Sequence, residues 1–93
     1  MRNYEFTIIF DAEDEKTKKG LDDVANLFKE GNVTITKQDD MGVRQLAYLI
    51  KKQDKGHYVY YELQAEPAAI VGFEKSLLLN SNVLKYLFVN TSK

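Results

Sequence analysis

The side chains that could carry out acid–base or nucleophilic chemistry are few. His57 is the single histidine among 93 residues, and the chain has no cysteine. Nucleophile–base pairs and metal sites need partner residues at fixed spacing, and neither a cysteine nor a second histidine can pair with His57. We therefore predict that His57 is an exposed residue at the end of a strand, and we expect no metal or cofactor.

A cluster of acidic side chains, Asp11-Ala12-Glu13-Asp14-Glu15, follows the first predicted strand. Acidic residues at the start of a helix complement the positive end of its dipole, and we prefer this interpretation to a cation site. Acylphosphatase-like enzymes bind phosphate with a loop after the first strand, but these carboxylates would repel phosphate. The sequence also has no glycine-rich phosphate loop. We therefore predict that the protein is not an enzyme.

The aromatic residues offer a second kind of chemistry, stacking on nucleic-acid bases. Lys55-Gly56-His57-Tyr58-Val59 begins like the strand motif of RNA-recognition domains, in which a basic residue and glycine precede two base-stacking aromatics. Tyr58 stands where that motif needs glycine or alanine. Tyr58 and Tyr60 are therefore either base-stacking residues or ordinary strand residues of high β propensity.

The elements that must position these residues follow from hydrophobic periodicity. Alternation with period two predicts strands over residues 4–10, 33–37, 42–51, 57–64 and 83–89, with the second and third separated by a break near Asp39-Asp40. Apolar residues at helical spacing predict a helix over residues 11–31, in which Leu21, Val24, Ala25 and Phe28 form the buried stripe. A second helix opens at Glu66-Pro67 and ends at Asn80-Ser81-Asn82. Its buried stripe contains Ile70, Phe73 and Leu77.

Three glycines are interpreted individually. Gly56 closes the sequence Asp54-Lys55-Gly56, which we interpret as a hairpin turn with glycine supplying the positive φ. Gly31 follows the first helix, where a left-handed residue is common. Gly20 lies inside that helix and costs about 1 kcal/mol relative to alanine, for no reason visible in the sequence.

The order of elements defines the fold class. Strand, helix, strand, strand, helix and strand predict an α+β protein with the ferredoxin-like βαββαβ arrangement. A four-stranded antiparallel sheet then carries both helices on one face, in a single domain spanning residues 1–93.

The two faces of this sheet can be assigned from the alternation. We predict that the helices cover Phe6, Ile8, Leu46, Tyr48, Tyr61, Leu63, Tyr86 and Phe88. The open face then presents Ile9, Ala47, Leu49, Tyr58, Tyr60, Leu87 and Val89. Monomers seldom leave such an apolar patch uncovered, so we expect a protein partner there.

Composition limits the classes of function. Hydrophobic content of 44% and charged content of 29% are typical of a globular protein. No apolar run approaches the roughly 20 residues of a membrane span, and the N-terminus lacks the pattern of a signal peptide, so we predict a cytoplasmic protein without a membrane partner. The net charge of −1 argues against coating nucleic acid by bulk electrostatics.

The stretch GVRQLAYLIK, residues 42–51, resembles the signature of the bacterial small-subunit ribosomal protein six family. That signature is Gly-x-basic-polar-Leu-Ala-Tyr-x-Ile-Lys, and the matching positions are Gly42, Arg44, Gln45, Leu46, Ala47, Tyr48, Ile50 and Lys51. The resemblance extends to residues 1–5 and 82–86. The family commonly has a second basic residue at the position of Gln45 and a proline at that of Leu49.

This resemblance implies a structural component of the small ribosomal subunit. Members of the family bind the central domain of the small-subunit rRNA together with small-subunit protein eighteen. The candidate phosphate contacts are Arg2, Arg44, Lys51 and Lys85, of which Arg2 and Arg44 are preferred because they match family positions. The candidate contacts for the partner protein are Ala47, Leu49, Tyr58, Tyr60, Leu87 and Val89.

One alternative stays open. A ferredoxin-like regulatory or ligand-binding domain that pairs through its sheet as a homodimer would also leave an apolar face on each chain. No small-molecule substrate is expected in the ribosomal interpretation. A homodimer without affinity for rRNA would favour the alternative.

Overall fold

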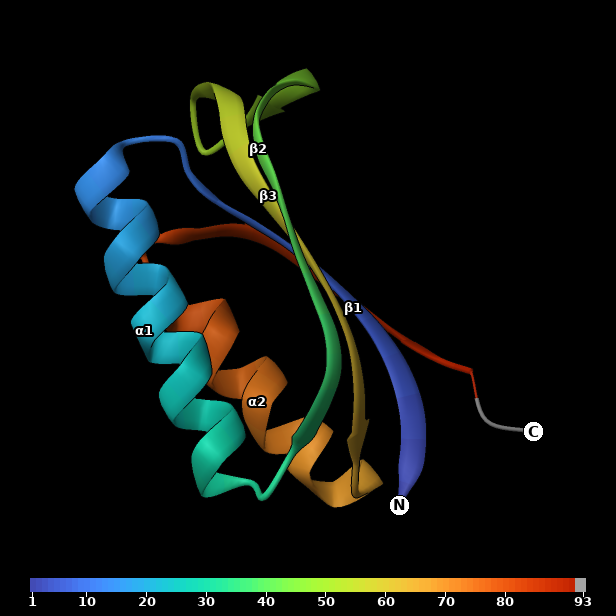
Figure 1. Cartoon of the computed structure of the whole chain (residues 1–93). Coiled ribbons are helices and arrows are strands. Elements are labelled where there is room, and N and C mark those ends of the chain that lie inside the picture. The colour runs from blue at the N-terminus through green and yellow to red at the C-terminus, as the bar shows by residue number, and fades with distance from the viewer. Residues whose placement is uncertain (92–93) are drawn as a thin grey trace.

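Each predicted element is present in the computed structural model, which describes residues 1–91. The elements in chain order are β1 (Arg2–Asp11), α1 (Asp14–Glu30), β2 (Thr34–Ile50), β3 (Gln53–Ala65), α2 (Pro67–Leu79) and β4 (Val83–Asn90). The four strands form one antiparallel sheet in the order β2-β3-β1-β4. Both helices lie on one face of it (Figure 1), which confirms the ferredoxin-like fold.

The main core lies between the helices and the sheet. Its centre is Phe6, which is fully buried and stacks on Phe88 with 4.2 Å between ring centroids. Phe28 of α1 and Tyr61 of β3 also contact the Phe6 ring. This arrangement confirms the predicted helix-facing positions on β1, β3 and β4.

The helices carry the predicted buried stripes, with two differences. Val24 and Phe28 of α1 and Ile70, Phe73 and Leu77 of α2 are buried, and Pro67 is the first residue of α2. Ala25, by contrast, is exposed. Helix α1 begins at Asp14, because Asp11 continues β1 and accepts the Glu13 N–H with its carboxylate.

The two glycines in and after α1 leave space for neighbouring rings. A Cβ on Gly20 would lie 2.5 Å from Cδ1 of Phe10, so α1 can approach β1 only where a side chain is missing. This contact explains the glycine that costs helix propensity. Gly31 has φ −85°, and Asn32 with φ 55° takes the left-handed conformation instead. The prediction for Gly31 was therefore wrong, and its role is to leave room for the Phe73 ring.

Strand β2 continues through the predicted break. Its pairing with β3 shifts register between Ile35 and Lys37 and again between Asp40 and Gly42. Gly42 has φ 77°, and its N–H donates to the Asp40 carboxylate over 2.9 Å. The Asp-Asp-Met-Gly segment is therefore a β-bulge within one long strand, not a turn between two strands.

The hairpin turn is at Lys51-Lys52, ahead of the Asp54-Lys55-Gly56 segment that the sequence suggested. Ile50 pairs with Gln53, and Lys51 and Lys52 between them have φ 49° and 65°. Two central residues with positive φ are the signature of a type I′ turn, which matches the twist of antiparallel strands. Gly56 is instead a residue of β3, where a Cβ would overlap the Ile9 side chain.

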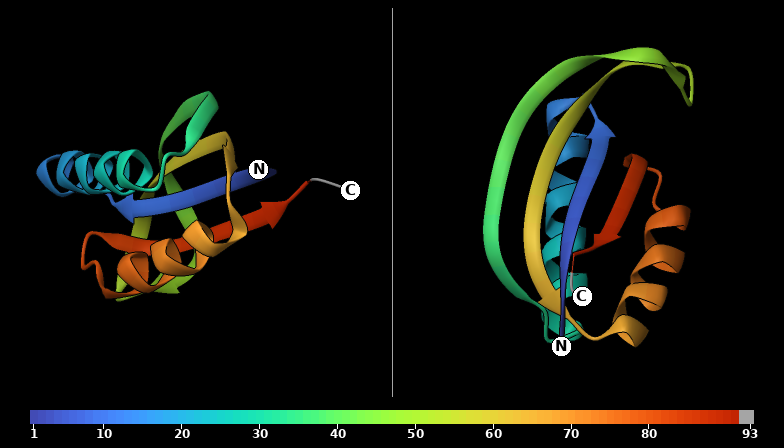
Figure 2. Two further views of the ribbon diagram at one scale, coloured as in Figure 1. Left: turned by 90° about the horizontal axis from the view of Figure 1, so that it is seen from below. Right: turned by 90° about the vertical axis from the view of Figure 1, so that its right-hand side faces the viewer.

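The β2–β3 hairpin is longer than the other strands and curves over their ends (Figure 2). We call residues 44–55 the hairpin arm. At its turn the Lys51 ammonium donates to the Val83 carbonyl over 2.9 Å, and the Gln53 amide donates to the Asp11 carboxylate over 3.4 Å. The arm therefore lies against the end of β1 and the start of β4. Within residues 1–91, neither helix combines the length and apolar composition that crossing a bilayer requires.

Candidate binding surface on the open sheet face

A second apolar cluster lies on the face of the sheet opposite the helices. Ile9, Leu46 and Leu84 are buried together, and Ile50 and Tyr58 pack against them. We call this the open-face cluster. It brings β1, β4 and the hairpin arm together, and the missing side chain of Gly56 lets Ile9 approach β3.

The position of Leu46 corrects the predicted faces of β2. Ile35 pairs with the core residue Leu63, so it faces the helices, and the two register shifts before Gln45 cancel. A third shift lies between Gln45 and Ile50, but Leu46 packs against Ile9 and Leu84, and Tyr48 bonds to Lys85. Even-numbered residues of the arm therefore lie on the open face, including Leu46 and Tyr48. Ala47 and Leu49 alternate with them and point the other way. Both are exposed, Leu49 by 65%.

The other predicted partner residues lie on the open face as expected. Tyr58 and Tyr60 pair with Ile9 and Thr7, and Leu87 lies opposite Thr7 on the other side of β1. Val89 follows Leu87 on β4, and both are exposed. Whether these residues contact a partner stays a prediction, but they form one surface beside the open-face cluster.

One end of the open face is acidic. Tyr60 lies among carboxylates there, because Glu62 is its neighbour on β3, Glu5 pairs with Glu62, and Asp39 pairs with Tyr60 itself. Loss of hydration and the charges of Glu5 and Glu62 raise the pKa of the Tyr60 phenol. Lys37 partly offsets this charge through ion pairs with Asp39 and Glu62, at 3.6 and 3.9 Å.

The other end of the open face is basic. The Lys85 ammonium donates to the Tyr48 hydroxyl over 3.0 Å and lies 5.7 Å from the centre of that ring. This hydrogen bond is the main cause that raises the pKa of Lys85. Arg44 is exposed on the arm, and its Nε–H donates to the Met41 carbonyl. With Lys51 at the turn, three of the four predicted phosphate contacts therefore lie at this end.

The fourth predicted contact, Arg2, lies elsewhere. It is the first residue of β1 and pairs with Ala65, whereas Lys85 pairs with Ile9 near the end of β1. Arg2 also falls on the alternation of Tyr4 and Phe6, which face the helices. The structure therefore does not bring Arg2 together with the basic end of the open face.

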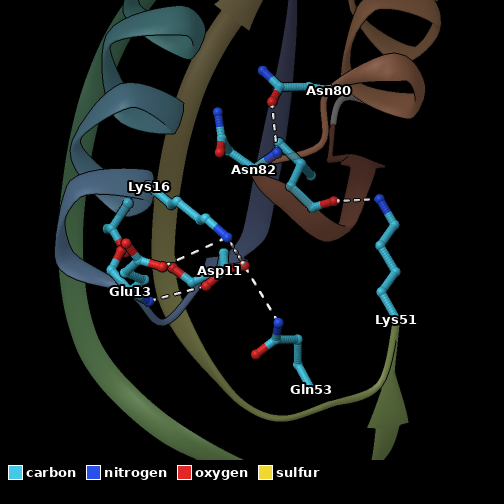
Figure 3. A network of polar contacts seen from close by, with 9 residues as sticks. Asp11, Glu13, Lys16, Lys51, Gln53, Asn80 and Asn82 are labelled. Atoms are coloured by element: carbon cyan, nitrogen blue, oxygen red, sulfur yellow. Dashed lines mark hydrogen bonds and ion pairs between the residues drawn. The ribbon is translucent and has the colours of Figure 1, made fainter.

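The acidic segment after β1 is engaged within the protein (Figure 3). Asp11 is buried, and its carboxylate receives the Glu13 N–H at 3.0 Å and lies 3.7 Å from the Lys16 ammonium. Its backbone carbonyl accepts the Thr17 hydroxyl over 2.6 Å, and its N–H donates to the Asn82 carbonyl. Asp11 thus joins β1, the start of α1, the arm and the start of β4.

His57 is not the isolated, exposed residue that the sequence suggested. Its Nε2 contacts the Asp40 carboxylate across the β2–β3 pair, and its side chain is only 19% exposed. The Gly42 N–H bond, and then the His57 contact, lower the pKa of Asp40. Sequence reasoning missed this pair, as it missed Tyr48 and Lys85, because neither pair is local in the chain.

These features define a class of protein. The open face has an apolar and aromatic centre, a basic end at Lys85 and an acidic end around Tyr60. These are the features of a ferredoxin-like α+β protein whose sheet is covered by helices on one face only (Figure 1).

The model of the ribosomal protein S6 family matches residues 3–90. The small-subunit protein bS6 of Treponema denticola is 38% identical over 89 residues, which cover 96% of each chain. The bS6 of Salinispora arenicola is 38% identical over 87 residues, or 91% of each chain. The crystal structure of the S6 protein of Thermotoga maritima has a TM-score of 0.86 at 22% identity, covering 96% of this chain and 86% of that one.

This chain therefore belongs to the ribosomal protein S6 family. It is a non-enzymatic, structural constituent of the small ribosomal subunit, as the resemblance implied. The alternative of a homodimeric regulatory domain has no comparable support.

Proposed function

We propose that this protein binds the central domain of the small-subunit rRNA together with small-subunit protein eighteen. The observation that carries the proposal is the division of the open face into an apolar centre and a basic end. Proteins seldom leave such an apolar patch uncovered, and clustered lysine and arginine attract phosphate. We assign the centre to the partner protein and the basic end to RNA.

The RNA contacts are assigned to Arg44, Lys51 and Lys85. Tyr48 holds the Lys85 ammonium and the Val83 carbonyl holds that of Lys51, so both side chains lose little freedom when a phosphate binds. Each ammonium has three donors and can therefore still reach a phosphate. Arg2 stands about 23 Å along β1 from the residue opposite Lys85, by the rise of an extended strand. It would contact a separate stretch of RNA.

The protein contacts are assigned to Tyr58, Tyr60, Leu87 and Val89. The carboxylates around Tyr60 would repel phosphate, which favours a protein over a stacked base at this tyrosine. Ala47 and Leu49 lie on the back of the arm, so a partner that reaches them must also fold round the arm.

One pair of binding measurements tests the proposal. Lys85→Ala should flatten the salt dependence of rRNA binding by about one unit, because one phosphate contact is lost. Lys18→Ala on α1 removes an equally charged, exposed residue and should leave the slope unchanged. Leu87→Asp should abolish association with protein eighteen, whereas Val71→Asp should not, although the exposed fractions of these two side chains are 59% and 58%. Identical behaviour within either pair would contradict the assignment of that surface.

A further inference from the structure

The two edges of the sheet are unlike each other. The outer strand β2 is interrupted by register shifts and carries charged residues along its length, such as Lys37, Asp39 and Arg44. Bulges and charges of this kind prevent a further strand from pairing with an edge. The outer strand β4 pairs regularly with β1 from Lys85 to Asn90 and has exposed apolar residues, Leu87 and Val89. Figure 2 shows β4, in red, at the margin of the sheet.

The register fixes which backbone groups of β4 face outward. The Thr91 N–H donates to the Asn3 carbonyl over 2.8 Å, so Thr91 and Asn3 are a hydrogen-bonded pair of the antiparallel ladder. Hydrogen-bonded pairs recur at every second residue of such a ladder. Val89, Leu87 and Lys85 are then bonded to β1 through both N–H and C=O. Tyr86 and Phe88 direct their N–H and C=O groups away from β1. Among residues 1–91, no strand lies beyond β4 to receive them.

The start of this edge is closed, which limits the free stretch. The Val83 carbonyl accepts the Lys51 ammonium, and the Val83 N–H donates to the Asn80 carbonyl over 3.1 Å. Next to this closed start is a hollow of about 250 Å³ between the arm, α2 and β4. Its lining is apolar apart from two lysines, and its main residues are Lys51, Leu78, Val83, Leu84, Lys85 and Tyr86.

We infer that an extended segment of the partner protein pairs with β4 as a fifth strand of the sheet. Its backbone bonds to Tyr86 and Phe88, and an apolar side chain of the segment enters the hollow. Lys51 and Lys85 at the hollow are assigned to phosphate, so the segment is recognised through its backbone and through that apolar side chain. The inference rests on the proposed function, since the same partner covers Leu87 and Val89 on the open face of this strand.

Backbone amide exchange in the complex with small-subunit protein eighteen tests this inference directly. Exchange of the Tyr86 and Phe88 amides should slow at least about tenfold on binding, because each N–H acquires a partner carbonyl. Leu87 and Val89 amides are already bonded to β1 and serve as internal references. A partner that covers only the open face would leave the Tyr86 and Phe88 amides exchanging as in the free protein, and the fifth strand would be disproved although binding stands.

Two further outcomes also overturn the inference. Slowing that appears in the free protein as its concentration rises would identify a second copy of this chain as the occupant. Slowing on addition of rRNA alone would identify the nucleic acid. Absence of any association with protein eighteen would instead disprove the proposed function, and the fifth strand with it.

A pair of neighbouring leucines supplies the matched variants. Leu78 lines the hollow and Leu79 does not, and both are strongly exposed, by 73% and 86%. Leu78→Asp places a charge in the lining that should receive the apolar side chain, and it should weaken binding of protein eighteen at least about tenfold. Leu79→Asp should leave the affinity unchanged. Equal effects of the two substitutions would show that the hollow takes no part in binding.

Discussion

The main core and the open-face cluster are both apolar, but they are built in different ways. The main core joins two helices to the central strands through residues at regular spacing, and Phe6 and Val59 in it are fully buried. The open-face cluster joins Ile9, Leu46 and Leu84 only because the hairpin arm curves over the end of the sheet. The first depends on secondary structure alone, whereas the second depends on the shape of one hairpin.

We therefore expect the main core to determine stability and the open-face cluster to determine binding. Most of the free energy of unfolding should come from the main core, where large aromatic rings are packed on all sides. The open-face cluster is small, but it holds the arm that carries Arg44, Tyr48 and Lys51. Damage to it should therefore affect the position of the basic residues more than the fold.

The largest expected effect comes from truncating matched residues in the two clusters. Phe6→Ala should lower the free energy of unfolding by about 3–5 kcal/mol, because it removes a ring that contacts three other aromatics. Leu46→Ala should cost about 2 kcal/mol, since the arm can partly close over the space. Chemical denaturation monitored by circular dichroism measures both values. Leu46→Ala should nevertheless reduce rRNA binding, because the arm loses its anchor.

The comparison would fail if Leu46→Ala destabilised the protein as much as Phe6→Ala. That result would mean that the arm and the main core unfold as one unit. A Leu46→Ala variant with unchanged rRNA affinity would show that the arm holds its position through the Lys51 and Gln53 bonds alone.

Glycine substitutions test the packing of each cluster from within, with smaller effects. Gly20→Ala pushes a methyl group into Phe10 of the main core, and Gly56→Ala pushes one into Ile9 of the open-face cluster. Overpacking typically costs about 1–3 kcal/mol. We expect the larger net cost at Gly56, where the Cβ would lie 2.3 Å from Ile9, because alanine at Gly20 also recovers about 1 kcal/mol of helix propensity. Thermal unfolding measures both.

Gly72 provides the control for this experiment. It lies inside α2, and a Cβ there would meet no atom within 4 Å. Gly72→Ala should therefore stabilise the protein by about 0.5–1 kcal/mol through helix propensity and a less flexible unfolded chain. The Gly56→Ala cost should also shrink in an Ile9→Ala background, where the contact is absent, and additivity of these two substitutions would disprove the contact.

The same comparison explains what could be predicted from the sequence. Periodicity identified every helix and strand of the main core. The helix-facing residues of β1, β3, β4 and α2 recur at the period of a single strand or helix, which can be read within that element. The face of Leu46 was predicted wrongly, because a break was assumed at Asp39-Asp40. The alternation that begins at Ile35 was therefore not continued into residues 42–51. The turn at Lys51-Lys52 was missed, because lysine seldom adopts positive φ. Glycine adopts it readily, so the turn was placed at Gly56 instead.

The candidate site was predictable in its composition but not in its arrangement. The open-face positions of Tyr58, Tyr60, Leu87 and Val89 follow from alternation, and three of the four chosen cations do lie at one end of the sheet. The pairs Tyr48–Lys85 and Asp40–His57 are contacts between strands whose register depends on bulges. Gly42 is a local signal for a bulge, but it does not give the register of the strands on either side, so the pairs cannot be derived from the sequence alone.

The smallest expected effect concerns Asp40, at the bulge where β2 leads into the hairpin arm. Hydrogen bonding from the Gly42 N–H, followed by His57, lowers the pKa of this carboxyl below its ordinary value of 3.8. A lowered pKa in the folded state means that the ionised form stabilises the fold. This contribution is present above the ordinary pKa and is lost as the pH falls through the lower one. Asp40→Asn should therefore remove a stabilisation that the native protein shows only above about pH 4.

The effect should be below about 1 kcal/mol, because the Asp40 side chain is more than half exposed to water. Chemical denaturation at pH 7 and at a series of lower pH values measures it, and the two proteins should differ at pH 7 and converge as the pH falls below the lowered pKa of Asp40. His57→Gln removes a lesser cause and leaves the Gly42 N–H bond, so it should retain most of the dependence on pH. If His57→Gln abolished the dependence, the histidine and not the bulge would hold the base of the arm. Amide exchange should then locate the loss of stability in β2 and β3 near the arm, with the main core unaffected.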